Sequence, residues 1–304
     1  MKEYPMNLEE FEKEFNTEEQ CLNYLFKLRW ENGYRCPRCE NEKARQVSGV
    51  KYECLNCGYQ TSVIAGTIFQ DTHKPLTLWF RAIWYITSQK NGTSALGLQR
   101  ILGLGSYRTA WTWLHKLRRA MVRQGRDKLI GIVEVDEAYI GSPGSGGKRG
   151  RGAENKIIIA VAVEINDKKI GRIRIDVIND VSSISLHEFI EQTIEKGSTI
   201  VTDGWTGYNG LTEKGYKQET SNHNNADKET LLPYVHTVIS LLKRWLLGTL
   251  QGSFSIDHIA YYFDEFTFRF NRRKSKSRGM LFYRLLQNAV HLNPTTYSDI
   301  IKKQ

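Results

Sequence analysis

Apolar and polar residues follow helical spacing through most of the first third of the chain. Residues 17–30 begin with a Thr-x-x-Gln capping box and predict a helix. Residues 75–90 open with a proline, continue with apolar residues at helical spacing and predict a second helix. Two further helices are predicted over 93–102 and 107–123, with a glycine-containing turn between them. This succession is typical of a helix-turn-helix, although an ordinary helical hairpin has the same pattern.

Near residue 130 the pattern changes from helical spacing to alternation. Residues 132–140 alternate between the two kinds of side chain and predict a strand. Two more strands are predicted over 156–164 and 171–178, and a helix over 183–196 follows them. A fourth strand is predicted over 199–202. Strands and a helix within one block predict an α/β or α+β domain.

The remainder of the chain is predicted to be a loop followed by helices. Residues 212–230 are polar and predict the loop. Residues 256–271 predict the last helical segment. Between them, residues 233–247 predict a helix with one apolar face, formed by Val235, Val238, Ile239, Leu242 and Leu246.

Composition and charge exclude several classes of protein. The chain has 304 residues, of which 40% are hydrophobic, and this excludes collagen, a coiled-coil rod and a disordered chain. No apolar run approaches the ~20 residues that cross a membrane, and no signal peptide is visible, so a cytoplasmic protein without a membrane partner is expected. The net charge is +10, and residues 1–30 carry −3 of their own, which leaves +13 for the rest. This suggests a nucleic acid as partner, and a merely soluble basic surface is an equal alternative on charge alone.

Four of the five cysteines form two Cys-x-x-Cys pairs, Cys36 with Cys39 and Cys54 with Cys57. Fourteen residues separate the pairs, which is a spacing typical of a zinc ribbon. Disulfides are the weaker explanation in a cytoplasmic chain. Four thiolates leave no open coordination position, so the predicted zinc is structural. Cys21 lies at helical spacing with apolar neighbours and is predicted to be a core residue.

Basic side chains cluster in the predicted helix over 107–123, in the loop over 141–152 and in residues 272–278, and we expect these three segments to contact DNA. Solvated surface charge is the alternative for the last two clusters. The loop over 141–152 and the segment after residue 271 are expected to neutralise backbone phosphates, so binding would weaken with salt. The candidate DNA-binding residues are Arg108, Lys116, Arg118, Arg119, Lys148, Arg149, Arg151, Arg272, Arg273 and Lys274.

Two aspartates occupy predicted strands, Asp136 in the middle of one and Asp203 at the end of another. An aspartate in an apolar strand is costly to bury unless it is paired or binds a metal. Asp136 could simply pair with an arginine, and Asp203 could cap the turn at Gly204. Together, two carboxylates on strands of one sheet suit Mg²⁺ and two-metal phosphoryl transfer.

With these features the chain resembles bacterial insertion-sequence transposases that join an N-terminal zinc ribbon to a DDE-type, ISXO-like catalytic domain. The resemblance implies an RNase H-like catalytic fold and cut-and-join DNA chemistry with Mg²⁺, for which Mn²⁺ can substitute. It also implies binding of the terminal inverted repeats and of target DNA, a homodimer on DNA, and a place with the nucleoid in the bacterial cytoplasm. The matching segments are Cys36–Cys57, Val135–Gly141, Thr202–Tyr208, His236–Trp245 and Tyr262–Arg273.

The third catalytic position departs from the usual glutamate of this family. The family often places a basic residue seven positions after that glutamate. Lys243 fits the basic position, and the residue seven before it is His236. His236 is therefore expected to complete the metal site with Asp136 and Asp203, which defines an Asp-Asp-His variant. Glu265, in the later segment, is the alternative third acid.

The sequence thus predicts an α/β (α+β) chain with a modular organisation. A non-catalytic zinc-ribbon regulator of DNA and a domesticated transposase remain the alternative functions. The expected parts are an N-terminal helical segment (1–32), the zinc ribbon (33–62), a helix-turn-helix-like DNA-binding region (63–127), the RNase H-like DDE domain (128–290) and a C-terminal tail (291–304).

Overall fold

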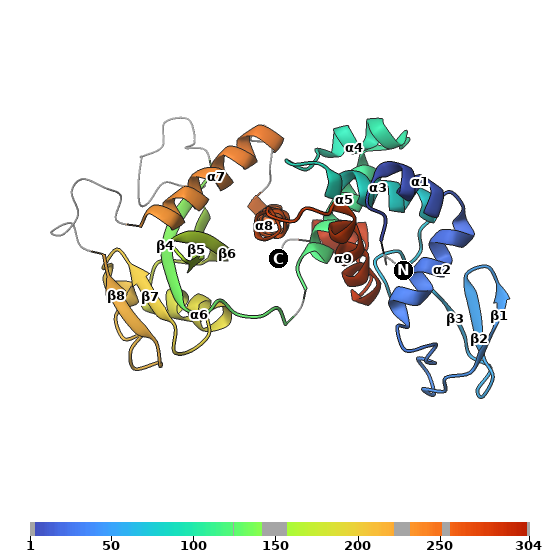
Figure 1. Cartoon of the computed structure of the whole chain (residues 1–304), viewed down its shortest axis with the longest axis horizontal. Coiled ribbons are helices and arrows are strands. Elements are labelled where there is room, and N and C mark those ends of the chain that lie inside the picture. The colour runs from blue at the N-terminus through green and yellow to red at the C-terminus, as the bar shows by residue number, and fades with distance from the viewer. Residues whose placement is uncertain (1–3, 124, 142–156, 222–231, 251–255, 303–304) are drawn as a thin grey trace. The chain divides into compact units, whose positions relative to one another are not determined.

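The computed structural model of the chain divides into two compact units (Figure 1). One unit contains residues 1–123 together with 274–304, and the other contains residues 124–273. This division differs from the expected boundary at 290, because the helix after residue 277 packs with the first unit. The structure describes residues 4–123, 125–141, 157–221, 232–250 and 256–302.

The first unit is mainly helical and has an aromatic core. Phe282 lies at the centre of this core, in ring contact with Phe11, Phe15, Phe80 and Trp84. The predicted capping box is present, since Thr17 and Gln20 exchange side-chain and backbone hydrogen bonds. The helices of this unit are α1 (Leu8–Glu14), α2 (Glu18–Arg29), α3 (Leu76–Ser88), α4 (Ala95–Leu102), α5 (Tyr107–Met121), α9 (Arg278–His291) and α10 (Tyr297–Ile301).

A small antiparallel sheet in this unit holds the cysteine pairs. Its strands follow the order β1-β2-β3, with bounds Ala44–Ser48, Lys51–Cys54 and Gln60–Ser62. The second cysteine pair begins at the end of β2, and Tyr34 packs beside Cys36 and Cys54 in a small cluster.

The second unit is built around a five-stranded mixed sheet of order β6-β5-β4-β7-β8. Strands β4, β5 and β6 are antiparallel, whereas β7 is parallel to β4 and β8 is parallel to β7. This order and these directions are those of the RNase H-like fold, so the predicted fold is confirmed. The strands are β4 (Ile132–Ile140), β5 (Ile157–Asn166), β6 (Lys169–Ile178), β7 (Thr199–Thr202) and β8 (Lys217–Thr220).

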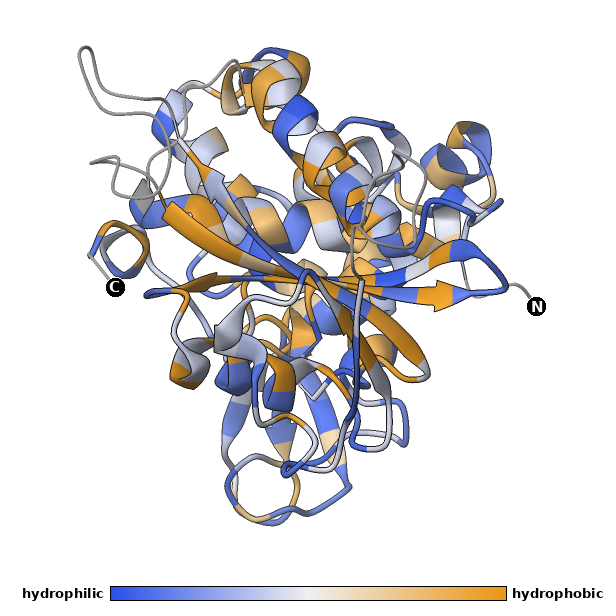
Figure 2. Cartoon of the chain, turned by 90° about the vertical axis from the view of Figure 1, so that its left-hand side faces the viewer, coloured by the Kyte–Doolittle hydropathy of each residue, from blue (hydrophilic) through white to orange (hydrophobic). Residues whose placement is uncertain are grey.

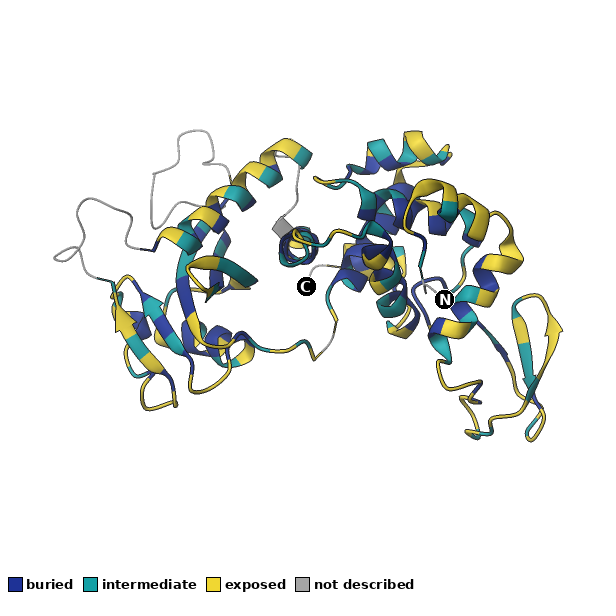
Figure 3. Cartoon of the chain, viewed as in Figure 1, coloured by how far each residue is buried: buried dark blue, intermediate teal, exposed yellow. Residues whose placement is uncertain are grey.

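Helices cover both faces of this sheet. Helices α7 (Pro233–Leu250) and α8 (Ile259–Asn271, after the short turn η3, Ile256–His258) share a core cluster with alternate residues of β4 and β5. Helix α6 (Ser183–Thr193) and the short helix η1 (Thr206–Tyr208) share a second cluster with the intervening residues. Hydrophobic residues run along the central strands between the layers (Figure 2). The predicted apolar face of α7 is confirmed, because its five residues are all buried (Figure 3).

The prediction that residues 212–230 form a loop was wrong at β8. This strand has the sequence KQET, lies at the sheet edge, and has no buried residue. A short polar edge strand buries neither face, so it leaves no alternating pattern in the sequence. The helices α9 and α10 were likewise not predicted, whereas α1 lies within the expected N-terminal helical segment (1–32).

Candidate active site and zinc centre

The four predicted zinc ligands come together in the structure. The sulfur atoms of Cys36, Cys39, Cys54 and Cys57 all lie within 4.8 Å of one another. Burial opposes ionisation of Cys36, but backbone N–H groups and neighbouring thiols that bond to its sulfur outweigh burial and lower its pKa to about 6. Thiolate character and four soft donors fit a structural zinc ion. In the described part of the chain, no other group of three or more metal-ligating side chains is this compact.

Asp136 lies near the centre of the sheet, on the face that α7 covers. Its strand is flanked by β5 and β7, and Asp136 pairs with Val161 of β5. The side chain is 14% exposed, and its Oδ1 accepts a hydrogen bond from the backbone N–H of Glu137 at 2.9 Å. Burial is the main reason that the pKa of Asp136 lies above its ordinary value. His236 and this N–H oppose the shift, and the charge of Asp203 adds to it.

His236 lies in the first turn of α7 and faces Asp136. Its Nε2 atom is 3.1 Å from Oδ2 of Asp136, and its side chain is 42% exposed. The structure therefore brings together two residues that are one hundred positions apart in the sequence. Lys243 lies two turns further along α7 and is exposed, at the spacing that places both residues on one side of the helix.

Asp203 directly follows β7, next to the strand that carries Asp136. In the parallel register, Val201 of β7 lies opposite Glu134 of β4. Asp203 is two residues further along and therefore lies at the level of Asp136. Its Oδ1 accepts the backbone N–H of Trp205 at 3.0 Å, and Gly204 takes a left-handed conformation (φ 84°) in this turn.

The three side chains form a donor set suited to a hydrated divalent cation. Among the described residues, His236 contacts Asp136, and no lysine or arginine pairs with either aspartate. Two carboxylates without a basic partner, beside an imidazole, match a cation that takes a few protein ligands and keeps several waters. The donor atoms of these three residues are more widely spaced than the four cysteine sulfurs, as expected for a metal site that water and substrate complete.

Two glutamates that sequence reasoning did not single out flank Asp136. Glu134 accepts backbone N–H groups from Tyr234 and Val235, at 2.9 and 2.7 Å. Glu137 projects to the opposite face of the sheet and accepts the hydroxyl of Tyr208 at 3.0 Å. Burial raises the pKa of both glutamates. The available signal was three acids within the apolar strand IVEVDEAYI, where each needs a partner.

Glu265, the alternative third acid, lies within α8 and is 1% exposed. Its Oε1 accepts two hydrogen bonds from the guanidinium of Arg269, at 2.9 and 2.7 Å. The structure therefore gives Glu265 a buried intrahelical ion pair, which is a structural role for a carboxylate.

The predicted DNA-binding residues of α5 differ in exposure. Arg108 is exposed and stacks over the ring of Tyr297, and Arg119 is partly exposed. Arg118 is 2% exposed, and the ammonium of Lys116 donates to the carbonyl of Ile68 at 3.3 Å. Most of α5 thus packs in the core of its unit, and its exposed residues lie mainly in the first turn.

The arginines that end α8 bond to protein carbonyls. Arg273 donates to the carbonyls of Phe270, Gly171 and Ile170, and Arg272 stacks over the ring of Phe268. These contacts join the end of α8 to the start of β6. Lys274 is exposed. The predicted contacts Lys148, Arg149 and Arg151 lie outside the described residues.

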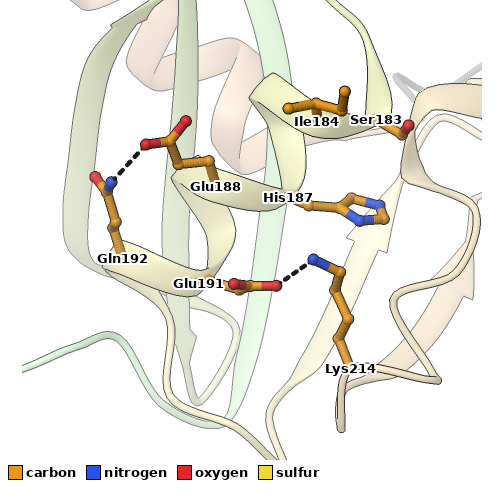
Figure 4. Close-up of a pocket in the computed structure, with 7 residues that line it drawn as sticks. All are labelled: Ser183, Ile184, His187, Glu188, Glu191, Gln192 and Lys214. Carbon is orange, nitrogen blue, oxygen red and sulfur yellow. Dashed lines mark hydrogen bonds and ion pairs between the residues drawn. The ribbon is translucent and has the colours of Figure 1, made fainter.

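A hollow of ≈ 520 Å³ lies against α6, away from these residues (Figure 4). None of the predicted site residues lines it. Polar groups of its lining pair with one another, since Lys214 forms an ion pair with Glu191 and Gln192 donates a hydrogen bond to Glu188. The hollow therefore does not coincide with the candidate active site.

The RNase H-like sheet, together with two family matches, supports a polynucleotidyl transferase of the DDE class. Residues 128–271 match the family described as an ISXO2-like transposase domain, and residues 16–60 match a transposase zinc-ribbon domain. The chain belongs to the insertion-sequence transposases with an N-terminal zinc ribbon and a DDE-type domain.

Two known proteins are similar to the chain. An uncharacterized protein in transposable element ISH50 of Halobacterium salinarum is 26% identical over 77% of this chain and 85% of its own length. The solved catalytic core domain of BIV integrase is 19% identical, with a TM-score of 0.30, over 44% of this chain and 80% of that one. Among the described helices, none is long and apolar enough to cross a membrane.

Proposed function

We propose that this protein is the DNA transposase of an insertion sequence. It binds the terminal inverted repeats of its element and catalyses Mg²⁺-dependent strand cleavage and strand transfer. The transposase domain and the relative in a transposable element support this proposal. The observation that carries it is the 3.1 Å approach of His236 to Asp136, with Asp203 on the adjacent strand at the same level.

The proposed catalytic residues are Asp136, Asp203 and His236, which would hold the divalent cation. The bound metal would activate a water or a 3′-hydroxyl and stabilise the leaving oxygen of the phosphodiester. His236 is preferred to Glu265 as the third ligand. Glu265 forms a buried ion pair with Arg269, whereas His236 is partly exposed and lies beside Asp136.

Lys243 would contact a phosphate of the DNA strand near the reacting end. It is exposed on the helix that carries His236, two turns away. Further DNA contacts are proposed for Arg108, Arg119 and Lys274, which keep exposed surface in their own unit. These contacts neutralise phosphates, so affinity should fall as salt rises.

The protein would act as a homodimer on DNA, because joining an element to a target requires both of its ends. It would work on the bacterial nucleoid, with the zinc ribbon and the α4–α5 region positioning the terminal DNA. Both statements rest on the family to which the chain belongs.

The proposal is tested with labelled DNA that carries the borders of the gene. Wild-type protein and Asp136→Asn are compared in Mg²⁺, in Mn²⁺ and in EDTA. Metal-dependent cleavage and joining, lost in Asp136→Asn, is the expected result. Sequence-specific binding without cleavage in either metal would contradict the proposal and favour a non-catalytic regulator or a domesticated transposase.

A further inference from the structure

We propose that Glu134 is a positioning residue that holds the first turn of α7 and thereby fixes His236 opposite Asp136. The inference rests on the proposed function, since it assigns a role within the same site. It also gives a reason for a second acid, beside Asp136, on the face of β4 that α7 covers, where the other residues are apolar.

Glu134 accepts two hydrogen bonds from the backbone of α7, both at the same carboxylate oxygen. Its Oε2 accepts the N–H groups of Tyr234 and Val235, and its residue is 4% exposed. The N–H groups of the first turn have no partner within a helix, so an external acceptor is required when they are buried. A carboxylate is the strongest acceptor there, because the helix dipole favours negative charge at the N-terminus.

The arrangement couples the two catalytic elements directly. Glu134 and Asp136 are two residues apart on β4 and therefore share one face of the sheet. The amide that bonds to Glu134 belongs to Val235, which immediately precedes His236 in the helix. Within α7 itself, the first turn contains no acidic residue. The strand that carries the catalytic aspartate thus also carries the acceptor that sets the start of the histidine's helix.

A direct role for Glu134 as a metal ligand makes a different prediction. A ligand needs the negative charge of the carboxylate, because Mg²⁺ prefers anionic oxygen. A positioning residue needs an acceptor oxygen at the same place, and glutamine supplies one with nearly the same shape. Glu134→Gln therefore separates the two roles, and Glu134→Ala removes both.

The matched control is Glu164, another buried carboxylate of the same unit. It is 3% exposed and accepts backbone N–H groups from Ile130 and Arg172, at 3.2 and 3.3 Å. It makes no contact with α7 or with the candidate catalytic residues among the hydrogen bonds of the described chain. Glu164 also pairs with the guanidinium of Arg172 at 2.7 Å, so Glu164→Ala should cost at least as much stability as Glu134→Ala, without displacing His236.

The experiment measures single-turnover joining of element-end DNA in saturating Mg²⁺ for the full-length protein and for these three variants. DNA affinity and melting temperature are measured in parallel, and hydrogen exchange follows the amides of the first turn of α7. We expect Glu134→Ala to slow joining by about 100-fold with unchanged DNA affinity, as a ~1 Å displacement of a catalytic group does. Glu134→Gln should recover most of the rate, and Glu164→Ala should join at nearly the wild-type rate despite a lower melting temperature.

Two results would overturn the inference. A Glu134→Gln protein that is as inactive as Glu134→Ala would assign Glu134 to the metal shell and not to a positioning role. Equal rates and equal α7 protection in Glu134→Ala and Glu164→Ala would show that the contact has no positioning role. Absence of joining by the wild-type protein in any metal would instead refute the proposed function, while exchange at α7 would still test the anchor.

Discussion

Replacing Cys57 by alanine should release the zinc ion and unfold the ribbon without unfolding the rest of its unit. Cys57 is only partly buried, so the substitution removes a metal ligand and little packing. Within residues 33–62, the buried residues are Tyr34, Cys36, Cys54 and Thr61. A segment with so small a core depends on its metal for its structure.

The expected magnitude follows from the size of the sheet. Its strands have five, four and three residues. Ordering those residues costs roughly 1 kcal/mol each, or about 12 kcal/mol in total. Structural zinc contributes about 10–16 kcal/mol in comparable four-ligand sites. Loss of the ion should therefore remove nearly all of the free energy that holds β1–β3, and their amides should exchange at the rates of an unfolded chain.

The assay combines zinc content with hydrogen exchange of peptides that cover β1–β3. Cys21→Ala is the matched control, because Cys21 is fully buried in α2 and lies outside the cysteine cluster. The control should keep one zinc per chain and a protected ribbon, even if its helical core is less stable. A Cys57→Ala protein that keeps both its zinc and its ribbon protection would refute this reasoning.

Three further predictions concern the catalytic unit. Glu265→Ala removes the carboxylate from a buried ion pair and should lower the free energy of unfolding by about 3–5 kcal/mol in chemical denaturation, whereas His236→Ala should leave it nearly unchanged. Tyr208→Phe removes a buried hydrogen bond and should cost about 1 kcal/mol, visible as a lower midpoint in urea. Burial raises the pKa of Asp136 above 3.8, so between pH 3.8 and that raised pKa the native state binds more protons than the unfolded state. The free energy of unfolding therefore falls as pH rises through this range. Asp136→Asn should therefore stabilise the metal-free protein more at pH 7 than at pH 4, and an equal effect at both pH values would contradict this sign.

The sequence predicted the elements in which apolar and polar residues alternate or follow helical spacing. Residues 132–140 were expected as a strand and form β4 with the same bounds. The cysteine spacing led to the observed cluster because four ligands must converge on one ion. Strand β8 was missed, since it is polar on both faces and is held by backbone pairing with β7 alone.

Two features of the structure depend on tertiary contacts, which the periodicity of residues along the chain does not reveal. The basic residues of α5 were expected to contact DNA, but packing of the helix in its own unit buries Arg118, and Lys116 donates a hydrogen bond to a backbone carbonyl. The pairing of Glu134 with the start of α7 spans one hundred positions. No local pattern encodes that contact, although an acid in an apolar strand does predict that some partner exists.

The most direct test of the account is the joining of element-end DNA by wild-type protein, Asp203→Asn and His236→Ala in Mg²⁺. The account predicts that the wild-type protein joins the DNA, that Asp203→Asn is inactive, and that His236→Ala loses most of its activity while all three bind the DNA equally. Full joining by His236→Ala, or binding without any joining by the wild-type protein, would contradict it.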